Sequence, residues 1–504
     1  MKVVANGKYF RVLPDSNEEA TRLRHQLMGW KQRKGDLWIV AEDNLVNRFV
    51  LGDVTGYKTE HTSVRPELDP ELGLLDYQVE DVTRMLMMRH CFNANPMGLG
   101  KTVETIATLR EANARSVCVV CPKIVRNQWA DQLKRWWGRD AIIFEKQRVL
   151  NEGNIYIINY DKLRNEKVLD KFRRFRWDWL VLDESHKIKN RASKQTLAVK
   201  QIPSARRLNL TGTPILRYVD DLWSQLNFLG EEYSGKSYWT FVDYFCEIEQ
   251  TPWGNKIVGT TDDPFKQSML RRLLSTCMIR QKSIEVAKGV TREVVRLPMS
   301  KAQRELYRKE KQLLLDQLPE NCTISNGAVL SMRLRQTTSW PGLFIEDEAG
   351  PKFEWVLEQC ENNPRENFVV FTVFEQTAEA LRKHLAAKGI RVVTITGKHK
   401  AQVNQRNKEF FIDGRAQVLI GTIGAMGQGY DGLQQASHIA IFLDRDWSPE
   451  IMAQAEDRLH RMGQDQVVNI YYLECRGSFD QSVGRINMNK SEGIRRALED
   501  ESED

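Results

Sequence analysis

The chain lacks several features that would place it in a special class of proteins. No run of about 18 consecutive apolar residues occurs, which is the length that a membrane-spanning helix needs. The first residues, MKVVANGKYF, do not contain the apolar stretch of a signal peptide. The hydrophobic content of 41% and the charged content of 28% are typical of a globular domain. We therefore expect a soluble, intracellular protein with no membrane partner, in the cytoplasm or nucleoid, or in the nucleus of a eukaryote.

Cysteine is also scarce, with eight residues scattered among 504. This pattern suits a reducing compartment, because small secreted domains are rich in disulfides. Cys118 and Cys121 form a C-x-x-C pair, but they lie within the apolar run SVCVVC. Residues three apart on a strand point to opposite faces of the sheet. We therefore do not expect this pair to bind a metal or to act as a redox centre.

The net charge of +7, with 74 Lys and Arg residues, mildly favours a polyanionic partner. This balance alone does not identify the partner, because many soluble proteins are equally basic.

Short apolar runs alternate with amphipathic stretches in two parts of the chain. The runs before residue 228 are SVCVV (116–120), IYIIN (155–159), WLVLD (179–183) and RLNLTGT (207–213). Those after residue 350 are NFVVFT (367–372), RVVTIT (391–396), QVLIGT (417–422), HIAIFLD (438–444) and VVNIYYL (467–473). Continuous apolar strands that alternate with helices indicate parallel sheets covered on both faces. The sequence predicts an α/β fold with two parallel-sheet lobes.

These patterns suggest the following division of the chain. We expect a small α+β module in 1–60, a first lobe in 66–228, helical insertions and a linker in 229–349, a second lobe in 350–480, and a disordered acidic tail in 481–504.

The stretch NPMGLGKT (95–102) nearly matches the phosphate-binding pattern G-x-x-x-x-G-K-[ST]. Asn95 stands where that pattern has glycine, and Pro96 removes a backbone donor. The donors nearest a phosphate would be the N–H groups of Gly98, Gly100, Lys101 and Thr102. A strand is expected before this stretch and a helix after it, and a helix N-terminus suits a triphosphate. The stretch is therefore a candidate nucleotide site, with a Gly-rich turn as the alternative.

The run WLVLDESH (179–186) ends an apolar strand on two carboxylates. Asp183 would hold Mg²⁺ beside Thr102, and Glu184 would orient and deprotonate the attacking water. The alternative is an ordinary acidic loop.

Two further stretches carry polar groups that could serve the same chemistry. RLNLTGTP ends a strand on Thr211 and Thr213, or forms a plain turn. QAEDRLHRMGQ places Arg458 and Arg461 three residues apart, on one face of a helix or turn. These arginines could reach a γ-phosphate, or they could belong to a solvated helix face.

Taken in order, these stretches resemble the Snf-type (switch/sucrose-nonfermenting) helicase-like ATPases of superfamily two. The resemblance covers roughly residues 68–475 and extends to LLDYQVEDVTRML, VVCPKIVRNQW, TCMIRQK, LPMSKAQRELY, LRQTTSWPGL, VVFTVFEQTAEALRKHL and GTIGAMGQGYDGLQQASHIAIFLDRDWSPE. Two departures stand out. Asn95-Pro96 replaces the usual Asp-Glu of the family, and Ile423 replaces an Arg or Lys of motif five.

The resemblance implies two RecA-like lobes, with ATP and Mg²⁺ as the nucleotide and its metal. Gln78 would bind adenine, and Gly98, Leu99, Gly100 and Lys101 would bind the phosphates. Thr102 and Asp183 would hold Mg²⁺, while Thr211 and Thr213 would couple hydrolysis to the grip on DNA. Gln454, Arg458 and Arg461 would complete the site from the second lobe. Contacts to DNA phosphates would come from Lys123, Tyr160 and Lys398.

The resemblance further implies an ATP-dependent translocase that is stimulated by double-stranded or branched DNA and has no sequence-specific site. It would remodel DNA structures or displace bound proteins, and the annealing-helicase and fork-remodelling branch resembles it most. Two alternatives stay open. One is a strand-separating helicase, and the other is a DNA-bound scaffold with a degenerate ATPase.

The N-terminal stretch faintly resembles the small substrate-recognition modules of fork-remodelling members. KVVA-NG-KYFRV predicts a hairpin with Asn6-Gly7 in its turn. Trp30 and Trp38 are interleaved with basic residues, namely Arg22, Arg24, Lys31, Arg33 and Lys34. This mixture suits DNA with exposed bases. The alternative is that both tryptophans pack the core of a cap on the first lobe.

Overall fold

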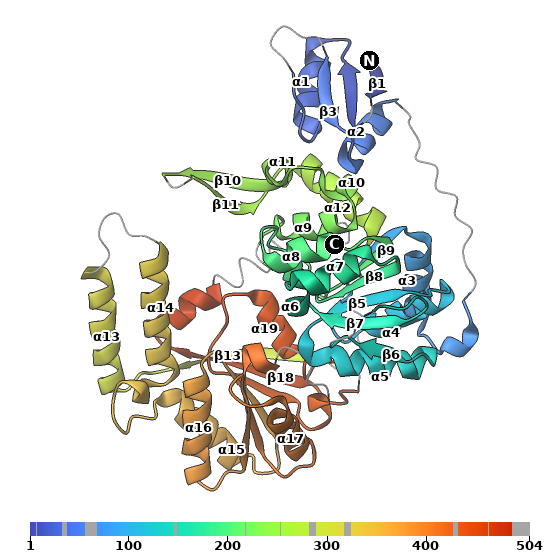
Figure 1. Ribbon diagram of the computed structural model, residues 1–504. Coiled ribbons are helices and arrows are strands. Elements are labelled where there is room, and N and C mark those ends of the chain that lie inside the picture. Colours follow the sequence, from blue (N-terminus) through green and yellow to red (C-terminus); the bar gives the residue numbers. More distant parts are fainter. Residues whose placement is uncertain are drawn as a thin grey trace. The chain divides into compact units, whose positions relative to one another are not determined.

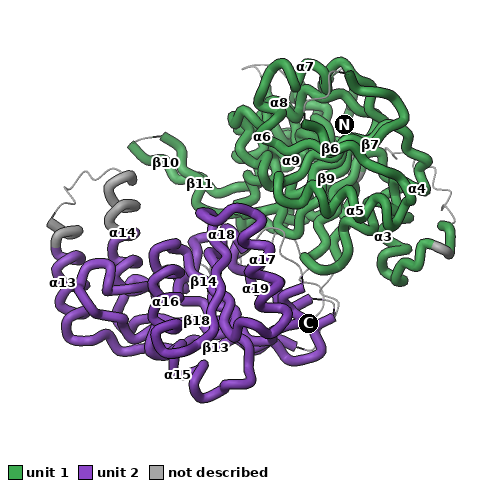
Figure 2. Tube along the Cα trace, turned by 60° about the horizontal axis from the view of Figure 1, so that its bottom comes forward, with its two compact units in different colours: residues 1–282, 492–504 green, residues 283–491 purple. Residues whose placement is uncertain are grey.

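The computed structural model describes residues 1–6, 8–32, 38–55, 68–145, 149–216, 218–252, 254–281, 289–316, 324–426, 432–461 and 463–485. These residues divide into two compact units, with unit 1 within residues 1–282 and unit 2 within residues 283–491 (Figure 2). Among the described residues, no helix has the length and apolar character needed to cross a membrane.

Unit 1 is built on a seven-stranded parallel sheet in the order β12-β4-β9-β8-β5-β7-β6 (Figure 1). Its strands are β4 (His90–Asn93), β5 (Val117–Cys121), β6 (Ala141–Ile143), β7 (Ile155–Asn159), β8 (Trp177–Asp183), β9 (Ser204–Leu210) and β12 (Met278–Ile279). The helices that accompany it are α3 (Asp76–Met87), α4 (Lys101–Glu111), α5 (Arg126–Trp137), α6 (Tyr160–Leu163), α7 (Glu166–Arg174), α8 (Lys194–Lys200) and α9 (Asp221–Leu229). The predicted strands of the first lobe are confirmed.

Alternate residues of each central strand enter different cores, as a sheet covered on both faces requires. Cys118 and Val120 belong to one buried cluster, whereas Val119 and Cys121 belong to another. The two cysteines therefore lie on opposite faces, as expected. Burial raises the pKa of both thiols, which opposes thiolate formation.

The N-terminal module contains a three-stranded antiparallel sheet, β1-β2-β3. Its elements are β1 (Lys2–Asn6), β2 (Tyr9–Leu13), α1 (Asn17–Gln26), β3 (Ile39–Glu42) and α2 (Leu45–Thr55). The hairpin is confirmed, and Asn6 pairs with Tyr9 as the last residue of β1, so Asn6 belongs to the strand and not to the turn. Gly7 lies outside the described residues.

The segment after α9 packs on the N-terminal module. It comprises α10 (Glu231–Ser234), α11 (Tyr238–Phe245), β10 (Cys246–Thr251), β11 (Gly254–Thr260) and α12 (Pro264–Cys277). Val12 and Leu23 of the module share one hydrophobic cluster with Phe241 and Met269 of this segment. The Tyr244 hydroxyl also donates to the Gln26 carbonyl over 2.6 Å. The module is thus part of the core of unit 1.

Unit 2 contains a six-stranded parallel sheet in the order β13-β18-β17-β14-β16-β15. Its strands are β13 (Val290–Leu297), β14 (Phe368–Thr372), β15 (Val392–Ile395), β16 (Val418–Thr422), β17 (Ile439–Phe442) and β18 (Val468–Cys475). Its helices are α13 (Lys301–Asp316), α14 (Ile324–Ser339), α15 (Pro351–Asn362), α16 (Glu375–Ala387), α17 (Ala401–Ile412), α18 (Ile423–Met426) and α19 (Pro449–Glu456). The α/β class with two parallel sheets is confirmed.

Single 3₁₀ turns link several of these elements. They are η1 (Pro70–Leu72), η2 (Lys123–Val125), η3 (Ser185–Ile188), η4 (Pro341–Leu343) and η5 (Leu433–Gln435).

The range 229–349 was predicted as helical insertions and a linker, but its described residues also form the strands β10 to β13. β10 and β11 pair as an antiparallel hairpin, while β12 and β13 add an edge strand to the sheets of unit 1 and unit 2. Edge strands are short or half-exposed, so they lack the continuous apolar run that marks a central strand. The predicted acidic tail lies outside the described residues from position 486 onward.

Candidate nucleotide site

The stretch NPMGLGKT connects β4 to α4 at the carboxyl edge of the unit 1 sheet. Gly98 and Gly100 both have φ of +84°, a left-handed conformation that glycine adopts without strain. Gly100 is the N-cap of α4, and a Cβ there would lie 2.5 Å from Gln78 Nε2. Lys101 Nζ donates to the carbonyls of Asn95 and Pro96 over 2.7 and 3.1 Å. The side chain of Lys101 is thus held against the loop at the N-terminus of α4. A loop of this kind at a helix N-terminus is the geometry of an anion site.

The first turn of α3 holds this loop from one side. The Tyr77 hydroxyl and Gln78 Nε2 both donate to the Leu99 carbonyl, over 2.9 and 3.2 Å. Gln78 Oε1 accepts from the N–H of Leu75. Burial, followed by the charges of Glu104 and Asp81, raises the pKa of Tyr77 to about 12. Both polar ends of the Gln78 amide are thus engaged with the protein, and its contact with adenine stays a prediction.

The two predicted carboxylates lie at the carboxyl end of β8, where Asp183 is the last residue of the strand and Glu184 follows it. This strand is two strands away from β4 in the same sheet. Asp183 accepts a hydrogen bond from Trp129 Nε1 over 2.8 Å. Burial, and then the neighbouring charge of Glu184, raise the pKa of Asp183, whereas the Trp129 bond and the charge of Lys101 oppose the shift. Asp183 is half-buried, and a carboxylate whose pKa is raised in this way gains from a nearby cation.

The donor set fits Mg²⁺ bound together with a nucleotide. In such sites Mg²⁺ takes one or two protein oxygens and completes its shell with phosphate and water. Asp183 supplies a carboxylate, and Thr102 supplies a hydroxyl at the start of α4. Within the described residues, no three His, Cys, Asp or Glu side chains form a self-contained metal site. The pair therefore suits a metal that arrives with its phosphate ligands.

Glu184 and the threonines after β9 belong to one hydrogen-bonded group. Glu184 has φ of +54°, an unusual conformation for a non-glycine residue that is typical of functional sites. His186 Nδ1 lies 3.3 Å from Glu184 Oε2 and 3.1 Å from Thr211 Oγ1. Thr211 Oγ1 in turn accepts from the N–H of Thr213 over 3.1 Å. Thr211 Oγ1 also donates to Glu184 Oε2 over 3.5 Å. The structure thus joins Glu184 to the threonines both directly and through His186, whose role the sequence analysis did not assign.

The candidate residues of unit 2 lie on α19 and in the turn that follows it. Gln454 and Arg458 are buried, with 6% and 5% exposure. Glu456, between them, accepts from Arg292 Nε and Nη2 over 2.9 and 2.7 Å. The Tyr472 hydroxyl also donates to Glu456. Because Arg292 lies on β13 and Tyr472 on β18, these two neighbouring strands fix the position of Glu456 and of the segment that carries Arg458 and Arg461.

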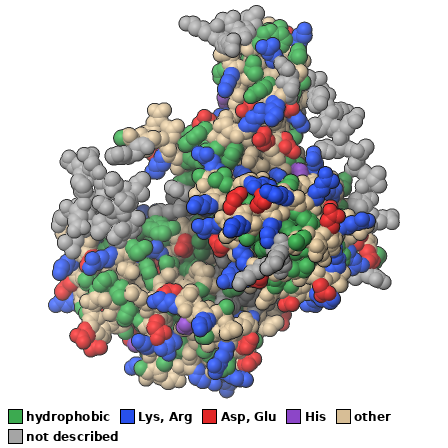
Figure 3. Space-filling model, in the orientation of Figure 1, with side chains coloured by type: hydrophobic (Ala, Val, Ile, Leu, Met, Phe, Trp, Pro, Cys, Tyr) green, Lys and Arg blue, Asp and Glu red, His purple; other side chains and the backbone are tan. Residues whose placement is uncertain are grey.

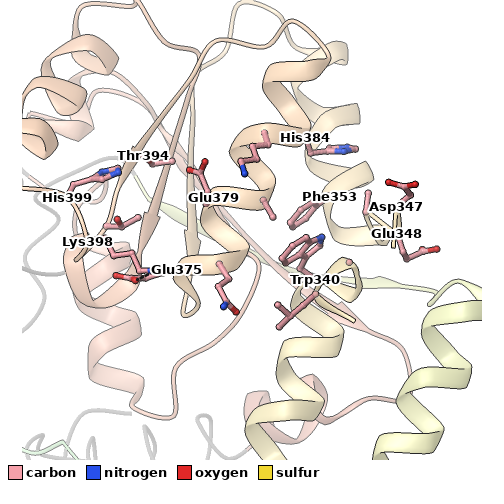
Figure 4. Close-up of a pocket in the computed structure, with 17 residues that line it drawn as sticks. Trp340, Asp347, Glu348, Phe353, Glu375, Glu379, His384, Thr394, Lys398 and His399 are labelled. Carbon is pink, nitrogen blue, oxygen red and sulfur yellow. Dashed lines mark ion pairs between the residues drawn. The ribbon is translucent and has the colours of Figure 1, made fainter. Parts of the chain in front are cut away.

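Three residues were expected to contact DNA phosphates, and the structure shows that they differ in exposure. Lys123 is exposed on η2. Lys398 is 72% exposed and pairs with Glu375 Oε2 over 3.4 Å. Both residues of this pair line an open cavity of about 930 Å³ in unit 2 (Figure 4). On the face shown in Figure 3, Lys and Arg side chains are interspersed with Asp and Glu.

The prediction that Tyr160 contacts DNA is wrong. Its side chain is only 3% exposed and packs in a hydrophobic cluster of unit 1. Its hydroxyl donates to the Asp183 carbonyl over 2.8 Å. Tyr160 follows an apolar strand at the sheet edge, where the sequence alone does not distinguish an exposed tyrosine from one that supports the loop of Asp183.

Packing explains why Ile423 stands where the family usually has an Arg or Lys in motif five. Ile423 is 1% exposed and belongs to a hydrophobic cluster of unit 2 with Phe371 and Leu419. It therefore contributes to the core instead of supplying a charge. Residues 427–431 of the same motif lie outside the described residues.

The N-terminal tryptophans differ in their surroundings. Trp30 is 38% exposed, and the guanidinium of Arg24 lies 5.9 Å from its ring centroid. Trp38 is half-buried, whereas Arg33 and Lys34 lie outside the described residues. The shared core described above supports the structural interpretation of the module, and its role in DNA recognition stays a prediction.

Comparison with known proteins gives two family matches. The model of the SNF2-related domain matches residues 32–343, and that of the helicase conserved C-terminal domain matches residues 351–463.

Individual proteins and structures are also similar. The human SWI/SNF-related matrix-associated actin-dependent regulator of chromatin subfamily A member 1 is 26% identical over 468 residues, covering 84% of this chain and 44% of that protein. An ISWI chromatin-remodeling complex ATPase of Saccharomyces cerevisiae is 25% identical over 435 residues, covering 77% of this chain and 37% of that protein. The chain thus spans less than half the length of these relatives. The SWI2/SNF2 ATPase core of Sulfolobus solfataricus in complex with dsDNA has 22% identity and a TM-score of 0.40, with coverage of 88% of this chain and 99% of that one.

Proposed function

The chain belongs to the family of proteins with an SNF2-related domain, and we propose on this basis that it is an ATP hydrolase stimulated by double-stranded DNA. The observation that carries the proposal is the shared sheet edge in unit 1. The loop of Lys101, the carboxylates Asp183 and Glu184, and Thr211 all follow strands of one parallel sheet. Ligands of open α/β sheets bind outside the carboxyl ends of such strands.

Each group in this proposal has a chemical role that its surroundings support. Lys101 and the N-terminus of α4 bind the β- and γ-phosphates. Thr102 and Asp183 would hold Mg²⁺, which would neutralise phosphate charge when bound. Gln454, Arg458 and Arg461 of unit 2 add hydrogen bonds and positive charge for the transferred phosphoryl group.

Glu184 is proposed to orient the attacking water and to accept its proton. The left-handed backbone of Glu184 and its neighbour His186 hold the carboxylate at the end of β8. Directly and through His186, the carboxylate of Glu184 is connected to Thr211, which in turn accepts from the N–H of Thr213. We propose that this connection makes hydrolysis sensitive to DNA.

The proposed output is movement along duplex DNA, which would remodel DNA structures or displace bound proteins. Lys123 and Lys398 are the proposed phosphate contacts, without preference for a base sequence. The names of the matched relatives refer to chromatin, and the assignment to the annealing-helicase and fork-remodelling branch stays a prediction.

ATP turnover with and without linear duplex DNA tests the proposal. Wild-type turnover is expected to rise on addition of DNA, and Lys101→Ala and Glu184→Gln are each expected to abolish it. Glu184→Gln should still bind ATP, because the amide keeps the shape of the side chain but cannot accept the proton. Lys134→Ala is the matched control, since Lys134 is an exposed lysine of α5. Normal turnover in either site variant would contradict the site assignment.

A further inference from the structure

A group of buried polar side chains behind the phosphate loop is not used by the mechanism above. Its members lie on α3, β4, the loop, α4 and the end of β12, and we name them the loop-anchor cluster: Asp81, Asn93, Asn95, Glu104 and Gln281. The first four are 0% exposed. Buried polar groups are costly unless they are hydrogen-bonded, so the bonds within this cluster decide whether the loop is stable.

Asn95 is the donor common to the two buried carboxylates. Its Nδ2 donates to Asp81 Oδ2 over 2.8 Å and to Glu104 Oε2 over 3.1 Å. Asn93 Nδ2 donates to the same Glu104 oxygen over 2.6 Å. The Asn95 amide therefore bridges α3 and α4, the two helices that flank the phosphate loop.

The other end of the Asn95 amide binds the chain segment that leaves unit 1. Asn95 Oδ1 accepts from the N–H of Gln281 over 2.8 Å, and Gln281 Nε2 donates to Asp81 Oδ1 over 2.7 Å. Arg280 Nη1 donates to the Ala94 carbonyl over 2.9 Å. The Asn95 carbonyl also accepts from Lys101 Nζ. Asn95 therefore contacts Lys101, both flanking helices and the segment that follows β12.

A carboxylate could not replace this amide. An ionised carboxylate only accepts hydrogen bonds, whereas an amide both donates and accepts. The site already holds two acids with little room for further negative charge. Burial raises the pKa of Glu104 to about 7 and also raises that of Asp81. The charged groups that act on these acids are Lys101, Arg84 and Glu80, with the phenol of Tyr77 near both.

We propose that Asn95 is a positioning residue for ATP binding, which holds the phosphate loop in place by donating to Asp81 and Glu104 at once. The inference rests on the proposed function. It also gives the departure from the Asp-Glu pattern a physical meaning: in this chain an aspartate at position 95 would put a third carboxylate beside two buried ones.

The test compares Asn95→Asp with the exchange variant Asn95→Asp/Glu104→Gln, in which amide and carboxylate trade places. For each we would measure kcat and KM for ATP, and the unfolding midpoint, at about pH 8. In Asn95→Asp, KM should rise at least about tenfold at pH 8 with a smaller change in kcat. The exchange variant should recover only part of this loss, because its glutamine at position 104 can donate to its aspartate at position 95, while that aspartate still faces Asp81, which has lost its bond from Asn95.

Asn165→Asp is the matched control, because Asn165 is exposed and its Oδ1 only accepts, from the N–H groups of Lys167 and Val168. A wild-type KM in Asn95→Asp at pH 8 would overturn the inference, as would an exchange variant that is as defective as the single one. If Asn95→Asp does not fold, the exchange variant alone decides, since it should fold and bind ATP. If wild type itself fails to turn over ATP, the proposed function falls, while the unfolding midpoints of the same variants still test the cluster.

Discussion

Replacing Lys352 by methionine is expected to destabilise unit 2 strongly. Lys352 lies on α15 and is 1% exposed. Its Nζ donates to the Leu443 carbonyl over 2.6 Å and to Asp480 Oδ2 over 2.8 Å. It also lies 3.9 Å from Asp444 Oδ1. Methionine fills a similar volume but leaves both acids without their cation.

The expected loss follows from the burial of these partners. The side chains of Asp444 and Asp480 are 3% and 11% exposed, so water replaces little of the lost interaction. Removing one partner of a buried ion pair costs about 3–5 kcal/mol. For a domain of about 150–250 residues, each kcal/mol lowers the unfolding midpoint by about 2–4 °C. The transition of unit 2 should therefore fall by about 6–20 °C.

The pH dependence of this contribution has a definite sign. Burial alone lowers the pKa of Lys352, but the carboxylates of Asp480 and Asp444 outweigh it, and the pKa is raised. A raised lysine pKa adds stability that is complete below its unfolded value and is lost only as the pH rises through the folded value. The deficit of Lys352→Met should therefore stay constant between about pH 6 and pH 9 as far as Lys352 is concerned.

Calorimetry of the full chain measures this loss, with Lys134→Met as the exposed control. The double variant Lys352→Met/Asp480→Asn should recover part of the stability, since it removes one of the uncompensated charges. A fall of less than about 2 °C in Lys352→Met would refute the argument, because it would mean that the buried acids do not need the lysine.

Two further predictions concern the motor itself. Arg461→Ala should lower ATP turnover by on the order of 10³-fold with a much smaller change in ATP affinity, because an arginine finger acts on the transition state; a loss below about tenfold would assign Arg461 a structural role only. Lys123→Ala and Lys398→Ala should each lower the slope of log affinity for duplex DNA against log salt by about one, whereas Tyr160→Phe should leave that slope unchanged. Titration of DNA binding at several salt concentrations measures all three variants, and a changed slope in Tyr160→Phe would contradict its burial.

The sequence by itself determined the class of fold and the centre of the candidate site. Continuous apolar runs mark central parallel strands, and polar residues directly after such runs must meet at one sheet edge. The stretches NPMGLGKT and WLVLDESH paired Lys101 and Thr102 with Asp183 and Glu184, and the coupling role of Thr211 and Thr213 came from the resemblance to the Snf-type ATPases. The roles of these residues stay predictions.

The tertiary structure decided what depends on contacts between distant parts of the chain. It buried Tyr160 under Asp183, brought Gln281 to Asn95 across 186 residues, and surrounded Lys352 with acids from the far end of unit 2. It also showed that β12 and β13 are edge strands of the two sheets, although the sequence predicted helical insertions and a linker in 229–349. Local patterns report which residues follow a strand, but burial and hydrogen-bond partners are set by long-range packing. The role of Asn95 followed only when the two acids beside it became visible.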